Sequence, residues 1–163
     1  MAGPSSSVRP GETRVAGAVP TRAWITTDAM QGLLRAQSAA ETAEPCGVLV
    51  GRMEGQAVRI GETPATPNAH PSPERAFRIA PQDILKVARA GRERGLTVLG
   101  FWHGHLKGPA HPGEADAEGL AAAEALGPSA RVLIVMGRGA GRAPVVRAYV
   151  RGEEGPREIP LAT

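Results

Sequence analysis

The sequence predicts an α/β fold of the α+β type, in which one mixed β-sheet is flanked by about three helices. The chain has 163 residues, which is enough for one hydrophobic core and too few to favour two domains. Segments with helical periodicity alternate irregularly with short apolar segments of the kind that form strands, and this order is typical of a mixed sheet. Aromatic residues make up only 3% of the chain, so we expect aliphatic side chains to fill the core.

The beginning of the chain differs in composition from the rest. Residues 1–19 are rich in Gly, Ser, Pro and Ala and show no apolar period, so we expect a flexible N-terminal leader and a single domain over residues 20–163. A helix is predicted from 28 to about 42, because apolar residues at helical spacing follow Thr27, a favourable N-cap. The apolar face of this helix should cover the sheet.

Two strands and a proline-rich loop follow this helix. The apolar run 46–51 and the alternating segment 56–64 are expected to pair as antiparallel strands, with residues 54–55 as the turn. Residues 66–74 contain three prolines, which favours an ordered loop that leads to a short strand at 76–79. These segments would add to one side of the sheet.

The second half of the chain is predicted to contain two helices and three strands. Pro81 suits the first turn of a helix that ends near Gly95. The Ala- and Glu-rich segment from 113 to about 126 predicts a third helix, which Gly127 and Pro128 would close. The strands are expected at 96–102, 131–136 and 144–151.

Composition excludes several classes of protein. Cys46 is the single cysteine, which excludes an internal disulfide and a zinc site of four thiolates. The net charge is +3, and the 19 Lys and Arg residues are scattered among 16 acids, so a nucleic-acid partner is not expected. The sequence shows neither an apolar run near the ~20 residues that span a bilayer nor the apolar core of a signal peptide. We therefore expect a cytoplasmic protein without a membrane segment, and leave its oligomeric state open.

The most informative motif is His103-Gly104-His105, which Asp116 follows after ten intervening residues. The histidines fall at the end of a predicted strand, where residues i and i+2 point to the same face. A catalytic zinc typically has three protein ligands and one open position. We therefore predict a Zn²⁺ site formed by His103, His105 and Asp116. Trp102 should point to the opposite face of the strand and pack against a helix.

Hydrolysis at such a site also needs a general base, and a carboxylate on a rigid element is suited to this role. Glu44, just before the predicted strand 46–51, is the best-placed candidate. Asn68 could contact an extended substrate tail or form a turn, and His111 could touch substrate or lie in solvent. Cys46 is interpreted as a small buried hydrophobe, with redox control as the alternative.

Three segments together resemble the JAMM (MPN+, Mov34/PAD-1) metalloprotease pattern of a Glu, a His-x-His and a Ser-x-x-Asp. They are residues 44–51, the two histidines, and residues 112–116. The stretch 67–79 resembles the bacterial branch of this family, and the resemblance extends over 24–150. It implies that residues 20–163 form an MPN-like domain in which the two histidines and Asp116 hold zinc and Glu44 is the base.

The same resemblance implies a substrate class. Family members cut peptide or isopeptide bonds, typically after the Gly-Gly tail of a ubiquitin-like protein. In bacteria, the substrates expected are ubiquitin-like sulfur-carrier proteins or their conjugates. The resemblance therefore implies a deubiquitinase-like zinc hydrolase.

One position departs from the family pattern, because Gly113 stands where the family has Ser. Loss of one oxyanion donor typically costs about 10²–10³ in rate, whereas Gly is a tolerable N-cap, so Asp116 should keep its place. Our hypothesis is that the backbone N–H of Gly113, or an ordered water there, replaces the missing donor. The departure favours a second interpretation, in which the protein is a zinc-retaining, weakly catalytic or non-catalytic module that binds ubiquitin-like tails.

Two other zinc-site classes fit the sequence less well. A RadC-like protein linked to DNA repair has a similar His-x-His motif, but the chain lacks the helical DNA-binding extension and a concentrated basic region. A cytidine-deaminase-like site requires a pair of Cys ligands, and the chain has one cysteine. The metallopeptidase interpretation is therefore preferred.

Overall fold

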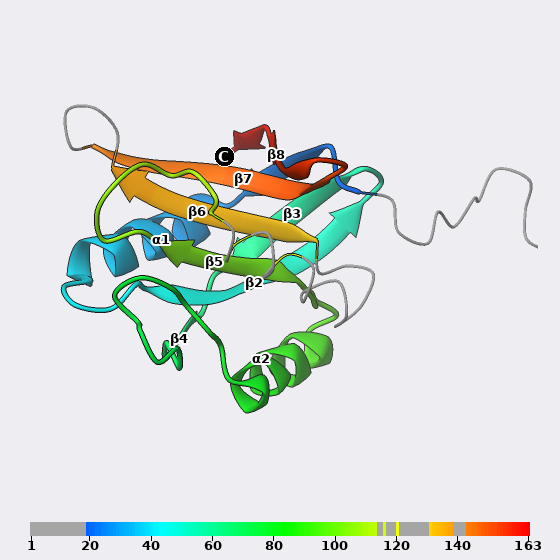
Figure 1. Cartoon of the computed structure of the whole chain (residues 1–163). Coiled ribbons are helices and arrows are strands. Elements are labelled where there is room, and N and C mark those ends of the chain that lie inside the picture. The colour runs from blue at the N-terminus through cyan, green and yellow to red at the C-terminus, as the bar shows by residue number, and fades with distance from the viewer. Residues whose placement is uncertain (1–18, 114–115, 117–119, 121–130, 139–142) are drawn as a thin grey trace, which may run out of the picture.

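The computed structural model describes residues 19–113, 116, 120, 131–138 and 143–163. In this part of the chain, nine strands form one mixed sheet and two helices pack on it (Figure 1). The elements are β1 (Arg22–Ile25), α1 (Thr27–Ala39), β2 (Cys46–Glu54), β3 (Ala57–Glu62), β4 (Ala65–Thr66), α2 (Pro81–Glu93), β5 (Thr97–Gly104), β6 (Val132–Arg138), β7 (Pro144–Gly152), β8 (Gly155–Ile159) and β9 (Leu161–Ala162).

The strand order is β8-β7-β6-β5-β2-β3-β1-β9, and β4 pairs with the start of β2. The pairs β5–β6, β1–β3 and β1–β9 are parallel, and the other pairs are antiparallel. The predicted mixed sheet is therefore confirmed, as are the antiparallel pairing of 46–51 with 56–64 and the helix that begins at Pro81. None of the helices in the described ranges is long and apolar enough to cross a membrane.

The helices lie on opposite faces of the sheet. Ala29 and Leu33 of α1 pack into one apolar cluster together with Trp102 of β5. The α2 residues Ile84 and Val87 pack against a second cluster on the other face. The fully buried Trp102 thus lies on the α1 face, which confirms its predicted packing against a helix.

The first helix begins and ends earlier than predicted. Thr26, and not Thr27, is the N-cap, because its side-chain oxygen accepts a hydrogen bond from the backbone N–H of Ala29 at 3.2 Å. The helix ends at Ala39, before the predicted end at 42, since Ala40 has an extended backbone (φ −73°, ψ 128°). This early end lets the chain run on as a loop to β2.

The predicted strand at 76–79 is wrong. Its backbone bonds to the preceding loop: the N–H of Ala69 donates to the carbonyl of Arg78 at 2.8 Å, and the N–H of Arg78 donates to Asn68 Oδ1 at 3.1 Å. A side-chain amide therefore supplies a partner that a neighbouring strand would otherwise supply. The short strand of this region is β4 instead, which pairs with Cys46 and Gly47.

The chain closes the sheet in a way that the sequence pattern did not indicate. β8 pairs with β7 at one end of the strand order and β9 pairs with β1 at the other, and only Pro160 lies between β8 and β9. The N–H of Ala23 in β1 donates to the carbonyl of Pro160 at 2.9 Å. The two outer strands are therefore connected through a single residue.

Two predictions fall largely outside the described residues. Of the predicted leader 1–19, only Val19 is described. Of the predicted third helix, the described residues are Gly113, Asp116 and Leu120, and the last two have helical backbone. Of the three predicted helices, the described residues therefore test the first two, and both are present.

Candidate metal centre

The three predicted metal ligands converge at the end of β5. The Nε2 atoms of His103 and His105 lie 3.3 Å apart. Asp116 Oδ1 lies 2.9 Å from His103 Nε2, and Asp116 Oδ2 lies 3.9 Å from His105 Nε2. One ligand atom from each residue falls within 4.8 Å of the others. Two imidazole nitrogens and a carboxylate oxygen in this arrangement can hold a metal ion and leave a position open.

The cluster contains a buried carboxylate that stays charged. His103 and Asp116 are 1% and 4% exposed, and His105 is half-buried. Burial alone would raise the pKa of Asp116, but its interactions with the nearby imidazoles of His103 and His105 outweigh burial and hold that pKa well below its usual range. The neighbouring carboxylate of Asp116 is also the main reason why the pKa of His105 is raised. Asp116 is therefore a charged carboxylate in a buried place, where a bound cation would compensate it.

Contacts behind the ligands orient them. His105 Nδ1 lies 2.8 Å from the carbonyl of Pro109, which fixes the tautomer that leaves Nε2 free to bind. The N–H of Gly113 donates to Asp116 Oδ2 at 2.6 Å. The ring of His103 stacks on Phe77, with 4.4 Å between centroids and 16° between planes. Each ligand is therefore held by a contact of its own.

The backbone of His105 is held by a residue that our sequence analysis missed. Gln37, in the last turn of α1, is 7% exposed, and its Nε2 donates to the carbonyl of His105 at 2.8 Å. A side chain at Gly104 would overlap Gln37 Oε1. Because Gly104, between the two histidines, has no side chain, it leaves the space that Gln37 occupies. The sequence does contain one indication of this residue: Gln37 is polar but lies four positions after Leu33, on the face of the helix that is buried.

This contact predicts a coupling between two substitutions. We expect Gly104→Ala to destabilise the fold by about 1–3 kcal/mol through overpacking. In the Gln37→Ala background the same change should cost less, with an interaction energy of about 1 kcal/mol or more. Urea unfolding of the wild type, both single variants and the double variant measures this coupling. Additive effects, within about 0.5 kcal/mol, would show that the two residues do not constrain each other.

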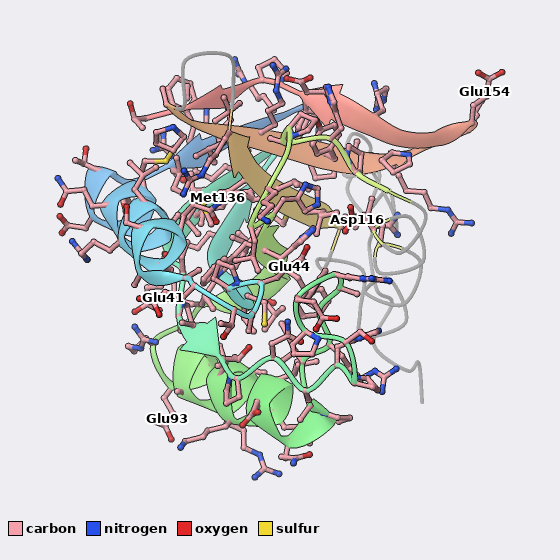
Figure 2. All side chains as sticks on the ribbon, turned by 60° about the vertical axis from the view of Figure 1, so that its left-hand side comes forward. Glu41, Glu44, Glu93, Asp116, Met136 and Glu154 are labelled. Atoms are coloured by element: carbon pink, nitrogen blue, oxygen red, sulfur yellow. The ribbon has the colours of Figure 1, made fainter. Side chains whose placement is uncertain are left out.

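Glu44 lies beside the predicted ligands without joining them. It is 5% exposed, and the described ligand atoms within 4.8 Å of one another do not include its carboxylate. Burial raises the pKa of Glu44, and the nearby charges of His103 and His105 partly offset this rise. Figure 2 shows Glu44 and Asp116 near each other in the middle of the molecule, and the charge of Asp116 also acts on Glu44. The arrangement suits a proton acceptor better than a further ligand.

An open cleft of about 870 Å³ reaches this centre, and Glu44 and His105 both line it. Charged side chains of both signs lie along it: Glu41, Glu74, Arg75, Lys107 and Arg138. A polypeptide segment could enter such a cleft and reach the predicted ligands.

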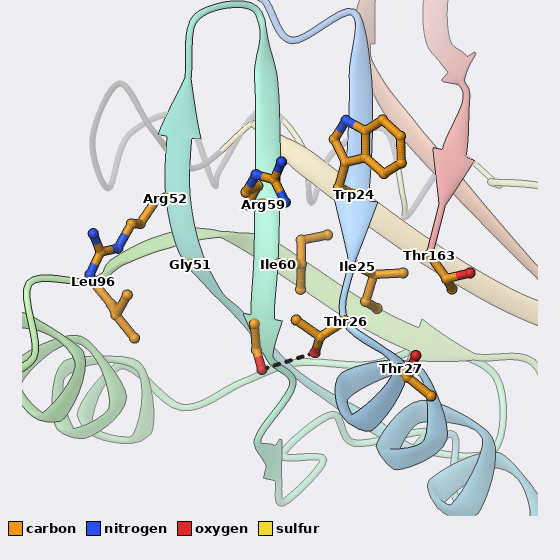
Figure 3. A pocket seen from close by; sticks show the side chains of 11 residues that line it. Trp24, Ile25, Thr26, Thr27, Gly51, Arg52, Arg59, Ile60, Leu96 and Thr163 are labelled. Atoms are coloured by element: carbon orange, nitrogen blue, oxygen red, sulfur yellow. Dashed lines mark hydrogen bonds between the residues drawn. The ribbon is translucent and has the colours of Figure 1, made fainter.

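A second pocket, of about 360 Å³, lies beside Trp24, Arg52 and Arg59 (Figure 3). Arg59 lies over the Trp24 ring at 6.0 Å and is paired with Glu54. None of the described residues that line this pocket is His, Cys, Asp or Glu. It therefore lacks the groups for hydrolytic chemistry that the cleft at Glu44 has.

The remaining predicted residues are placed as follows. Asn68 directs its amide at the surrounding backbone, which supports the turn-forming alternative. His111 is exposed, and its contact with substrate stays a prediction. Cys46 is 1% exposed, and burial raises the pKa of its thiol, which fits the small-hydrophobe interpretation. The N–H of Gly113 is bonded to Asp116, so the structure does not support its use as the oxyanion donor.

Comparisons with known proteins identify the family. Residues 26–151 match the model of Prok-JAB, the prokaryotic homologs of the JAB domain. The chain therefore belongs to the JAB (JAMM) family, in its prokaryotic branch. The sequence resemblance to this family is confirmed.

One similar protein comes from Thermus thermophilus and bears the name "Probable TtuB-protein conjugate cleaving protease". It is 38% identical over 73 residues, which cover 45% of this chain and 46% of that protein. The chain thus spans about half the length of this curated relative.

Two solved structures share the fold. The solution structure of DSY2949 from Desulfitobacterium hafniense has a TM-score of 0.72 at 24% identity, and the match covers 86% of this chain and 92% of that one. A solution structure from Salinibacter ruber has a TM-score of 0.58 at 18% identity, and the match covers 85% and 89%. At these identities the likeness concerns the fold alone.

Proposed function

We propose that the protein is a zinc-dependent metallopeptidase that hydrolyses peptide or isopeptide bonds. The observation that carries the proposal is the convergence of His103, His105 and Asp116 beside a cleft that His105 and the buried Glu44 line. Membership of the JAB family supports it. A buried set of two nitrogen donors and one charged oxygen donor fits Zn²⁺, which such ligands commonly bind in catalytic sites.

Zinc, when bound by these three residues, would supply a Lewis acid that polarises the scissile carbonyl and promotes deprotonation of water. Asp116 contributes the negative charge that offsets the cation. Glu44 takes up the proton of the attacking water and delivers it to the leaving amine, and its raised pKa favours both transfers at neutral pH. The walls of the cleft hold the extended substrate beside Glu44 and His105.

The substrates we propose are ubiquitin-like sulfur-carrier proteins or their conjugates, cut after a Gly-Gly tail. The name of the Thermus thermophilus relative, a TtuB-protein conjugate cleaving protease, supports this class. We further propose that residues 20–163 form the catalytic domain and that the protein acts in the cytoplasm without a nucleic-acid partner. An isopeptidase of this kind needs a cleft open to a polypeptide, as the cleft at Glu44 is.

The decisive experiment uses Gly-Gly-terminated ubiquitin-like proteins fused to a short peptide. We expect the zinc-loaded protein to release the peptide from at least one fusion and a chelator to stop the release. Binding of the fusions without any cleavage would overturn the peptidase proposal. That result would establish the alternative, a zinc-retaining module that binds ubiquitin-like tails.

Gly113 is the observation that favours this alternative. The family pattern has Ser there, and the backbone N–H at this position is engaged by Asp116. Of the two replacements that our hypothesis names for the missing donor, only an ordered water remains. The catalytic strength of the natural site therefore depends on whether that water stabilises the developing oxyanion.

The substitution Gly113→Ser tests this point. Among the described residues, the nearest atom to a Cβ built at Gly113 is Asp116 Oδ2 at 3.9 Å, and the backbone there is not left-handed, so these residues leave room for the serine. If a water already serves as donor, turnover of the cleaved fusion should be unchanged. A rise of about 10²–10³ in kcat would instead show that the natural site lacks an oxyanion donor. The matched control is Gly61→Ser, at an exposed position of β3 where the backbone is not left-handed and a Cβ meets no described atom within 4 Å.

A further inference from the structure

The side-chain amide of Asn68 lies where two parts of the candidate site meet. Its Nδ2 is within hydrogen-bond distance of three backbone carbonyls, those of Glu44 (3.1 Å), Pro73 (3.4 Å) and Ala76 (2.9 Å). Its Oδ1 accepts from the N–H groups of His70 and Arg78, both at 3.1 Å. The amide is thus saturated by the backbone and has no capacity left for a substrate.

These bonds join the segment that carries Glu44 to the segment that carries Phe77. One bond goes to Glu44, whose own N–H donates to the carbonyl of Pro73 at 2.7 Å. Two others go to Ala76 and Arg78, the residues on either side of Phe77 in the sequence. Asn68 therefore fixes the backbone of the proposed base and the backbone that carries Phe77.

Phe77 in turn contacts a predicted metal ligand. Its ring stacks on His103 at 4.4 Å. His103 Nδ1 is buried and has no hydrogen-bond partner among the described residues, whereas His105 Nδ1 lies 2.8 Å from the Pro109 carbonyl. On the side away from Nε2, the stacked Phe77 ring is thus the contact that holds the ring of His103, in place of the usual hydrogen bond behind a ligand.

We propose that Asn68 is a positioning residue that holds Glu44 and, through Phe77, the ring of His103 in one rigid unit. The role of Glu44 as base rests on the proposed function, but the link from Asn68 to His103 stands on the geometry alone. An asparagine is required because the site needs a donor and an acceptor on one short planar group. Aspartate would keep the acceptor oxygen, but its second oxygen cannot donate to the three carbonyls and would repel them.

The first test measures the ring of His103 in the metal-free protein by NMR. The stacked Phe77 ring shifts the ring protons of His103 upfield, and Phe77→Leu calibrates the size of this ring-current shift. In Asn68→Asp we expect most of the shift to be lost. Gln56→Glu, the same chemical change in the exposed turn before β3, should keep it. A full shift in folded Asn68→Asp would overturn the proposal.

The second test measures cleavage of the ubiquitin-like fusion by the wild type and by Asn68→Asp, at a temperature where both of these proteins are folded. We expect Asn68→Asp to lower kcat by about 10–100-fold, the scale of an active-site group displaced by roughly 1 Å, with KM little changed. Wild-type kcat in the folded variant would contradict the link to Glu44. If Asn68→Asp does not fold, Asn68→Ser is used with the same two criteria.

The two measurements separate this inference from the function on which it depends. If the wild-type protein cleaves no fusion, the proposed function fails, and the NMR measurement still decides whether Asn68 positions His103. If cleavage occurs and Asn68→Asp leaves both the ring-current shift and kcat unchanged, the proposed function stands and the inference is wrong.

Discussion

Replacement of Glu44 by Gln should abolish most hydrolysis while zinc stays bound. We expect kcat to fall by about 10²–10⁴-fold, the contribution of a positioned general acid–base, because the amide keeps the shape of Glu44 but cannot accept the proton. The Kd for zinc should not change, since Glu44 is not among the described ligand atoms that converge. Cleavage of the ubiquitin-like fusion and a zinc titration measure the two quantities.

The matched control for this change is Glu93→Gln. Glu93 is exposed at the end of α2, and Figure 2 shows it far from Glu44, so its removal should leave both kcat and the zinc Kd unaltered. Loss of zinc from Glu44→Gln would show that Glu44 is a ligand. Full activity of Glu44→Gln would mean that the proton acceptor is another group.

The second large effect is expected for zinc binding in Asp116→Asn. Changes in residues behind a ligand cost about 10–100-fold in metal affinity, and the loss of the charged ligand itself should exceed the upper end of that range. The neutral amide removes the carboxylate of the converging set and the charge that a cation would compensate. Competition with a chromophoric chelator measures the Kd.

Asp28→Asn is the control for Asp116→Asn. Asp28 lies in the first turn of α1, is exposed and does not belong to the converging ligand set. Its replacement should leave the zinc Kd unchanged. If Asp116→Asn bound zinc as tightly as the wild type, the ligand set proposed for the site would be incorrect.

The sequence was sufficient to predict that the two histidines would converge, because strand geometry is local. Two histidines at i and i+2 must share a face of an extended chain, and the structure brings their Nε2 atoms to 3.3 Å. The resemblance to the JAMM pattern indicated the two acids, Asp116 and Glu44. The sheet type and the second helix could also be predicted, because they follow from local periodicity and the order of the segments along the chain.

What the sequence did not reveal depends on contacts between distant segments. Gln37 bonds to His105, 68 positions away, and no local pattern indicates which buried carbonyl a helix side chain will meet. The strand expected at 76–79 failed because Asn68 competes for its backbone. The strand β9 has only two residues, and β1 and β8 do not alternate apolar and polar residues in the way that marks a strand.

The link through Pro160 has consequences for folding and for self-association. Because β1 pairs with β9 through Ala23 and Leu161, nearly the whole described chain lies between these two partners. Such high contact order is typical of slow folding, since loop closure precedes the gain from the contact. In the folded protein, the long strands β7 and β3 are covered by neighbours, and the outermost strands are short. The sheet therefore offers little edge on which another copy of the chain could add a strand.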